Sequence, residues 1–145
     1  MQTKVIRIVT LFILLSVSCI NAFAKSFIKN GIYYAGNDDT KEASVVQVNN
    51  KDVISIPDDV EYDDVTYKVT SIATNGLAWC TMKQLIIGKN VRSIGQGACA
   101  GCMSLVSVTM GESVSFIDEG AFSSCYSLKD ISWPSAVKKK KKGMF

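Results

Sequence analysis

Apolar residues between positions 91 and 137 recur at one fixed spacing. Val91 and Val114 stand 23 positions apart, as do Ile94 and Ile117. The same spacing joins three further pairs, namely Cys102 and Cys125, Leu105 and Leu128, and Val108 and Ile131. A period of this length is the sequence signature of a solenoid, in which each unit buries its apolar face against its neighbours.

The repeat pattern begins before position 91. A third copy with one residue deleted carries its apolar positions at Val69, Ile72, Leu77, Cys80, Met82, Leu85 and Ile87. Further upstream, four residues align with Leu85, Ile87, Gly88 and Val91, and these are Ile54, Ile56, Pro57 and Val60. We therefore expect the first coil to start near position 53, with residues 61–68 inserted in it as a hairpin.

Each repeat divides into three predicted pieces. Residues 105–110 form a strand that turns Val108 and Met110 inward, while Ser107 and Thr109 face outward. Residues 114–117 form a second short strand. Residues 119–125 are too short and too glycine-rich for a stable helix, so one tight turn of 3₁₀ or α type is expected. Stacked coils then build two narrow parallel sheets, with neighbouring strands ~4.8 Å apart.

The segment before the repeats is rich in predicted strands. Asn30-Gly31 lies between apolar runs and supplies the positive φ angles of a two-residue hairpin turn. Residues 43–48 and 53–56 have strand character, and residues 60–69 form a second candidate hairpin with an Asp-Asp turn. Residues 25–68 are interpreted as a β-rich N-terminal cap, because an open solenoid end would expose its apolar face.

Residues 1–24 have the pattern of a secretory signal peptide. Lys4 and Arg7 precede an almost wholly apolar run at 8–20, and Ala22-Phe23-Ala24 forms a small-x-small site, so cleavage is expected after Ala24. A membrane anchor is disfavoured, because this apolar run is too short to cross ~30 Å of hydrocarbon as a helix. A lipoprotein modified at Cys19 remains an alternative.

Charge and composition exclude several classes of function. The whole chain has a net charge of +3, but residues 25–137 carry nine Lys or Arg against thirteen Asp or Glu, which gives −4. An acidic body without a basic patch disfavours nucleic acid as a partner. The chain has no histidine, which removes Ser-His, Cys-His and histidine–metal arrangements. No cofactor is expected.

Cys99-Ala-Gly-Cys102 matches the C-x-x-C pattern of redox and zinc sites. The repeat offers a simpler explanation, because Cys80, Cys102 and Cys125 share one repeat position, and Cys99 takes the place of Leu77 and Phe122. A zinc site also needs further ligands that the chain lacks. We predict free, buried thiols, and a thiol-dependent redox protein that uses Cys99 and Cys102 is kept as a disfavoured alternative.

The repeat motif Val-x-x-Ile-Gly-x-Gly-Ala-Phe-x-x-Cys-x-x-Leu-x-x-Val-x-x-Pro resembles the BspA-like branch of leucine-rich repeats. The resemblance covers residues 69–137 and, more loosely, 53–60, and it is best at Ile117, Gly120, Ala121, Phe122, Ser124, Cys125, Leu128, Ile131 and Pro134. It implies a leucine-rich-repeat β-solenoid that is secreted or held at the surface of a host-associated bacterium. It also implies a non-enzymatic role in adhesion or protein–protein interaction.

The chain departs from that pattern after Val137. Lys138–Lys142 replaces the next expected repeat, so the layout becomes a signal peptide (1–24), a cap (25–68), three repeats (69–137) and a lysine-rich, disordered tail (138–145). We expect the last repeat to lack a C-terminal cap. A truncated fragment of a longer repeat protein, with no independent function, is therefore a second hypothesis.

The leading hypothesis places a protein ligand, such as a host matrix or cell-surface protein, on the outward strand face. Its candidate residues are Gln84, Ile86, Ser107, Thr109, Asp130 and Ser132. Each of them could equally be an ordinary solvated residue. No stable membrane insertion is expected once the signal is removed. Edge-to-edge self-association is expected through the uncovered last strand, which carries Ile131 and Trp133.

Overall fold

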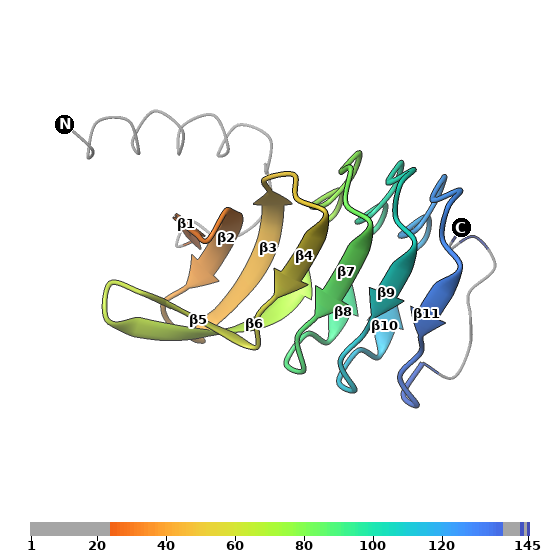
Figure 1. Ribbon diagram of the computed structural model, residues 1–145. Coiled ribbons are helices and arrows are strands. Elements are labelled where there is room, and N and C mark those ends of the chain that lie inside the picture. The colour runs from red at the N-terminus through yellow and green to blue at the C-terminus, as the bar shows by residue number, and fades with distance from the viewer. Residues whose placement is uncertain (1–23, 138–142, 144) are drawn as a thin grey trace.

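The computed structural model describes residues 24–137, 143 and 145. Figure 1 shows a row of coils stacked side by side, with a β-rich unit at its N-terminal end. The predicted signal peptide and lysine run therefore lie outside the described residues, apart from Ala24 at the start of the first strand. The described residues form strands and turns but no helix.

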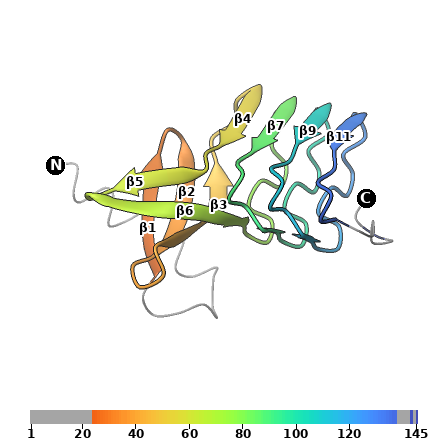
Figure 2. The same cartoon turned by 90° about the horizontal axis from the view of Figure 1, so that it is seen from below.

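Two sheets make up the described structure. The larger has seven strands, six of them in the order β1 (Ala24–Lys29), β2 (Ile32–Asn37), β3 (Glu42–Val48), β6 (Val65–Ile72), β8 (Ser93–Ile94) and β10 (Phe116–Ile117), with β5 (Asp59–Tyr62) also paired to β6. The smaller has four strands, in the order β11 (Asp130–Ser132), β9 (Ser107–Thr109), β7 (Gln84–Ile87) and β4 (Val53–Ile56). Figure 2 shows the two sheets on opposite sides of the stack. The predicted solenoid of short parallel strands is confirmed. The larger sheet is mixed rather than wholly parallel, because the cap strands β1, β2 and β5 pair antiparallel within it.

Both predicted hairpins of the cap are present. Asn30 (φ 53°) and Gly31 (φ 82°) turn the chain between antiparallel β1 and β2. Asp63 (φ 50°) and Asp64 (φ 59°) do the same between β5 and β6. Positive φ at both central residues is the geometry of the type I′ turn, whose twist matches that of the flanking strands. Strand β3 then pairs in parallel with β6 and joins the cap to the coils.

The cap is held together by aromatic residues. The ring of Phe27 lies 4.6 Å from that of Tyr62 and 5.3 Å from those of Tyr34 and Tyr67, measured between centroids. The Tyr67 hydroxyl donates a hydrogen bond to the Asp38 carboxylate. Phe27, Tyr34 and Tyr67 are buried and belong to the same core cluster as the inward residues of the coils, so the cap extends the core at the N-terminal end.

Strand registers confirm where the solenoid begins. Ile54 on β4 pairs with Leu85 on β7, so the first coil includes β4, as the alignment of these two residues predicts. This pairing spans a longer stretch of chain than the pairing of Ser71 on β6 with Ser93 on β8. The first coil is longer because the β5–β6 hairpin is inserted within it.

The segments between the strands correct the expectation of helical turns. Ala78 N–H donates back to the Asn75 carbonyl at 3.1 Å, the i→i−3 bond of a turn. Its neighbour Leu77 donates to the Ala98 carbonyl of the next coil at 2.7 Å, and Trp79 donates to Ala100 at 2.8 Å. Local and inter-coil hydrogen bonds thus alternate along the backbone. In a helix every backbone N–H group would donate along the helix axis, so none could form hydrogen bonds to the next coil.

The core runs without interruption from the cap into the coils, and burial decreases at the last coil. Phe122 is buried as predicted, while Leu128, Ile131 and Trp133 are only half-buried. Beyond the lysine run, the described residues 143 and 145 contact the last coil. Gly120 N–H donates to the Gly143 carbonyl at 2.6 Å, and the Phe145 ring lies 6.4 Å from that of Trp133.

Candidate functional site

The six predicted surface residues lie on one face of the four-stranded sheet. They form two rows that cross the strands, because Gln84 pairs with Ser107 and Ser107 with Asp130, while Ile86, Thr109 and Ser132 pair in the same way. Strands β4, β7, β9 and β11 lie side by side, and this face is turned toward the viewer in Figure 1. The structure thus brings all six candidate residues together.

Strand β4 extends both rows by one residue. Val53 is the register partner of Gln84, and Ser55 is the register partner of Ile86. Both side chains are exposed. Sequence reasoning did not include them in the surface, although the alignment of Ile54 with Leu85 carried the necessary signal, since residues flanking an inward position face outward on a strand.

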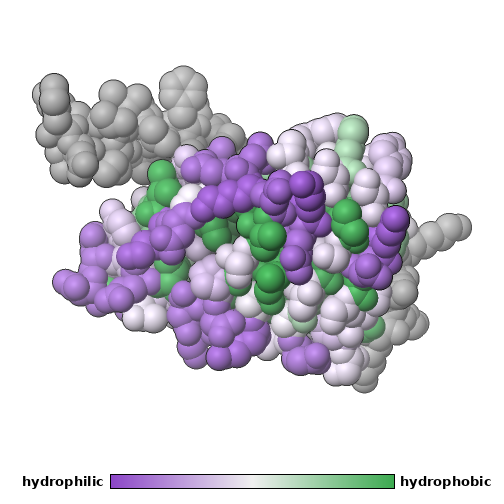
Figure 3. All heavy atoms as spheres, viewed as in Figure 1, coloured by the Kyte–Doolittle hydropathy of each residue, from purple (hydrophilic) through white to green (hydrophobic). Residues whose placement is uncertain are grey.

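The resulting surface, here called the ladder face, is built from short side chains. Its eight members are Val53, Ser55, Gln84, Ile86, Ser107, Thr109, Asp130 and Ser132. Asp130 is the one ionisable residue among these eight, and Figure 3 shows separate hydrophobic patches among hydrophilic residues on this side of the molecule. Asp130 is in register with Ser107, so the face offers one carboxylate among short hydroxyl and aliphatic side chains as binding contacts.

Ion pairs flank the ladder face and link successive coils. Lys83 pairs with Asp52 at 3.0 Å, and Lys89 pairs with Asp58 at 2.8 Å. The Lys89 side chain and its backbone N–H both donate to Asp58, which lowers the pKa of that carboxyl. These groups are exposed, so their contribution to stability is small.

The cysteines occupy the core, as predicted, with one correction. Cys80, Cys99 and Cys102 are buried, whereas Cys125 is half-buried, and all four are free thiols. Cys102 donates to the Leu77 carbonyl at 3.0 Å, and Cys125 donates to the Cys99 carbonyl at 3.1 Å. Among the described residues, no group of His, Cys, Asp and Glu is arranged to hold a metal ion.

The thiols of the C-x-x-C pair are poorly suited to redox chemistry. Burial raises the pKa of Cys99 well above its usual value. The hydrogen bond with Cys125 raises the pKa of Cys102 to about 11, while the same contact lowers the pKa of Cys125. Because the thiolate is the reactive form, a raised pKa and a buried position lower the reactivity of both members of the pair near neutral pH.

The architecture defines the class of protein. Parallel coils of nearly constant length, with a column of inward aliphatic residues and a continuous strand face, are those of a leucine-rich repeat solenoid. Residues 64–145 match the family model described as the BspA type leucine rich repeat region. The chain belongs to this family.

Solved structures of bacterial leucine-rich repeat proteins share the fold. A protein from Bacteroides capillosus is 27% identical with a TM-score of 0.74, and the match covers 79% of this chain and 86% of that one. A leucine rich cell surface protein from Faecalibacterium prausnitzii is 25% identical (TM-score 0.65), with 74% of this chain and 30% of that one covered. The leucine-rich repeat protein of T. pallidum is 23% identical (TM-score 0.66), with 76% and 50% covered. A search of curated protein sequences finds no match.

Within residues 24–137, 143 and 145, no helix is long and apolar enough to cross a bilayer.

Proposed function

We propose that this chain is an exported, non-enzymatic interaction module that binds a protein ligand through the ladder face. The observation that carries the proposal is the pair of in-register rows across β4, β7, β9 and β11. Repetition of outward positions at the ~4.8 Å strand spacing produces an extended surface from a short repeat. The solved cell surface protein from Faecalibacterium prausnitzii supports a location outside the cell.

The construction of the ladder face favours binding. Its strands are fixed by backbone hydrogen bonds on both sides, except at β4 and β11, and their inward residues are fully packed from β4 to β9. Short Ser and Thr side chains lose little rotamer freedom when a partner covers them. A rigid face with little entropy to lose can hold a partner of matching shape without rearrangement.

A host matrix or cell-surface protein is the proposed ligand class. The residues between 25 and 137 carry a net charge of −4, which favours a protein partner with a basic contact surface over nucleic acid. Adhesion follows from such binding if the protein is displayed at or released from the cell surface. The absence of histidine and the burial of the C-x-x-C thiols support a non-enzymatic role.

Binding is tested with immobilised fibronectin, laminin and collagen and with intact epithelial cells. Thr109→Arg combined with Ser132→Arg places two long charged side chains in one row of the ladder face, and should weaken binding at least ten-fold. Ser113→Arg combined with Ser135→Arg is the matched control, because both serines are exposed and lie outside the rows. Equal binding by the two double variants, or no binding by the unaltered protein, would contradict the proposal.

Export is tested separately. Material recovered from the culture medium or the cell surface should begin at Lys25, as cleavage after Ala24 requires. An N-terminal sequence starting at Met1, or a lipid-modified Cys19, would refute this processing.

A further inference from the structure

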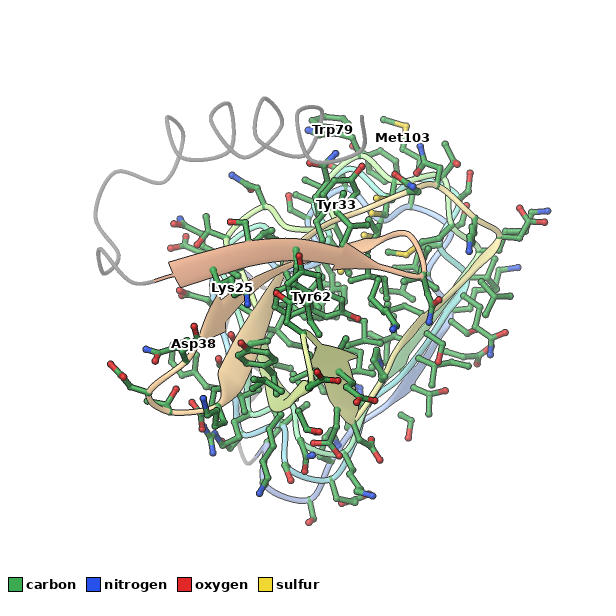
Figure 4. All side chains as sticks on the ribbon, turned by 90° about the vertical axis from the view of Figure 1, so that its left-hand side faces the viewer. Lys25, Tyr33, Asp38, Tyr62, Trp79 and Met103 are labelled. Atoms are coloured by element: carbon green, nitrogen blue, oxygen red, sulfur yellow. The ribbon has the colours of Figure 1, made fainter. Side chains whose placement is uncertain are left out.

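A second surface feature, separate from the ladder face, lies between the end of β3 and the turn that follows β6. It is a hollow of about 530 Å³, a volume typical of small-ligand sites. Val46, Gln47 and Asn50 line one side, and Asn75 and Trp79 line the other. Figure 4 shows Trp79 on the same side of the molecule as Tyr33, which is the register partner of Gln47.

Trp79 has a backbone conformation that bulky residues rarely adopt. Its φ is 61°, in the left-handed region, and its side chain is 70% exposed. The equivalent positions of the next two coils hold Gly101 (φ 72°) and Ser124 (φ 60°). The turn therefore does not require an aromatic residue at this position. A strained, exposed tryptophan at a site where glycine suffices is a reason to look for a function.

The indole is held in place by the next coil. A Cβ atom added to Gly101 would lie 2.4 Å from an atom of the Trp79 ring, so the ring rests directly on the bare glycine backbone. One side of the indole is thereby supported, and the high exposure of the residue leaves the rest of the ring open. The result is a fixed aromatic platform at the edge of the hollow.

The polar groups of the hollow are uncharged. Gln47, Asn50 and Asn75 supply three carboxamides, and the lining contains no Lys, Arg, Asp or Glu. The Asn50 Oδ1 accepts a hydrogen bond from Thr81 N–H at 3.1 Å, which fixes that amide and leaves its NH₂ group as a donor. A phosphate, a carboxylate or a basic ligand would find no opposite charge here.

We propose that this hollow binds a pyranose unit of a neutral glycan. The apolar C–H face of such a ring can stack on the indole of Trp79, since the aromatic face carries partial negative charge. Carboxamides both donate and accept hydrogen bonds, which suits hydroxyl groups that do the same. The proposal is independent of protein binding at the ladder face, because the two surfaces share no residue.

The test uses the full protein and a panel of neutral saccharides, namely lactose, maltotriose, cellotriose, triacetylchitotriose and methyl mannoside. Binding is followed by tryptophan fluorescence and by saturation-transfer NMR. At least one member should bind saturably. Trp79→Gly should abolish this binding while keeping the fold, because glycine occupies the same position in the next coil. Trp79→Phe should retain part of the affinity, and Gln47→Ala should lower it several-fold.

Two controls separate the site from the rest of the surface. Trp133→Phe removes the other tryptophan, and Met103→Ala alters an exposed residue of the neighbouring coil, so both should bind like the unaltered protein. The proposal is overturned if no saccharide in the panel binds or if Trp79→Gly binds normally. It is also overturned if a mixture of short peptides, in place of saccharides, is bound at Trp79.

Discussion

The ring of Phe122 lies 6.3 Å from the ring of Phe145, and the two residues stand one repeat length apart in the chain. Phe122 is 1% exposed, whereas Phe145 is 62% exposed. The contact is reinforced by the hydrogen bond from Gly120 to Gly143. Gly143 and Phe145 therefore lie against the last coil and take up part of the space that a further coil would occupy.

The burial of Phe122 leads to the first prediction. Phe122→Ala should lower the free energy of unfolding by ~3–5 kcal/mol, because it empties a large inward position that neighbouring coils cannot refill. Urea unfolding followed by circular dichroism measures the change. Phe116→Ala is the control, since that side chain is 46% exposed and its loss should cost far less. Equal effects of the two substitutions would show that the inward register is wrong.

Strand β11 leads to the second prediction, because it lies at the edge of the four-stranded sheet. An edge strand presents backbone groups that can pair with another chain, and the charges of Lys138–Lys142 oppose this pairing by repulsion. Self-association should therefore increase as salt screens those charges. Sedimentation velocity at low and high salt measures it. Appending one consensus repeat with a polar cap should suppress it, and a protein that stays monomeric at every salt concentration would contradict the prediction.

The third prediction concerns the cysteines. The denatured mature protein should contain four free thiols, and iodoacetamide should modify them slowly in the folded state. Cys125 should react first, because it is half-buried and its pKa is lowered by Cys102, whereas Cys99 should react last. Mass spectrometry of timed samples gives the order. Two or fewer thiols in the denatured protein would instead demonstrate a disulfide.

The fourth prediction concerns alkaline pH. Burial raises the pKa of Tyr34 to about 12, from an ordinary value of about 10. A group whose pKa is raised by folding stabilises the protein fully at pH values below its pKa in the unfolded chain. This stabilisation is lost as the pH rises through its pKa in the folded protein. Stability should therefore fall between about pH 10 and about pH 12.

Tyr34→Phe tests this dependence, because it removes the titrating hydroxyl and should make the fall in the urea midpoint less steep. Burial and the hydrogen bond to Asp38 also raise the pKa of Tyr67, so some pH dependence should remain. Tyr126→Phe serves as the control, since that side chain is 80% exposed. If Tyr34→Phe leaves the slope unchanged, the buried hydroxyl is not the source of the alkaline sensitivity.

Periodicity explains which parts of this structure can be predicted from the sequence. Equivalent residues such as Ile94 and Ile117 occupy equivalent places, so the coils, the four-stranded sheet and the ladder face follow from the spacing. The cap strands of the larger sheet lie outside the repeats and do not follow from it. The turns are harder to predict, because their alternating hydrogen bonds depend on left-handed residues whose identities differ between coils, such as Trp79 and Gly101.

The end of the chain carried a periodic signal that sequence reasoning passed over. Gly143 and Phe145 follow Gly120 and Phe122 by one repeat length, and they contact those same two residues. The lysine run that precedes them lacks the apolar residues by which the earlier repeats are recognised. A repeat that keeps only two of its positions is therefore not revealed by a continuous apolar pattern.

The coils that follow the inserted hairpin are not all of one length, and the difference is confined to the turn between β6 and β7. The pairing of Ser71 with Ser93 spans one residue fewer than the pairing of Gln84 with Ser107, so the missing residue lies between the two sheets. The alignment places it between Cys80 and Met82, beside Thr81, whose N–H donates a hydrogen bond to the Asn50 side chain. A single-residue insertion there leaves every inward side chain inward, while the same insertion within β7 would reverse its two faces. Insertions and deletions of single residues should therefore be tolerated in the turn between β6 and β7 and selected against within the strands.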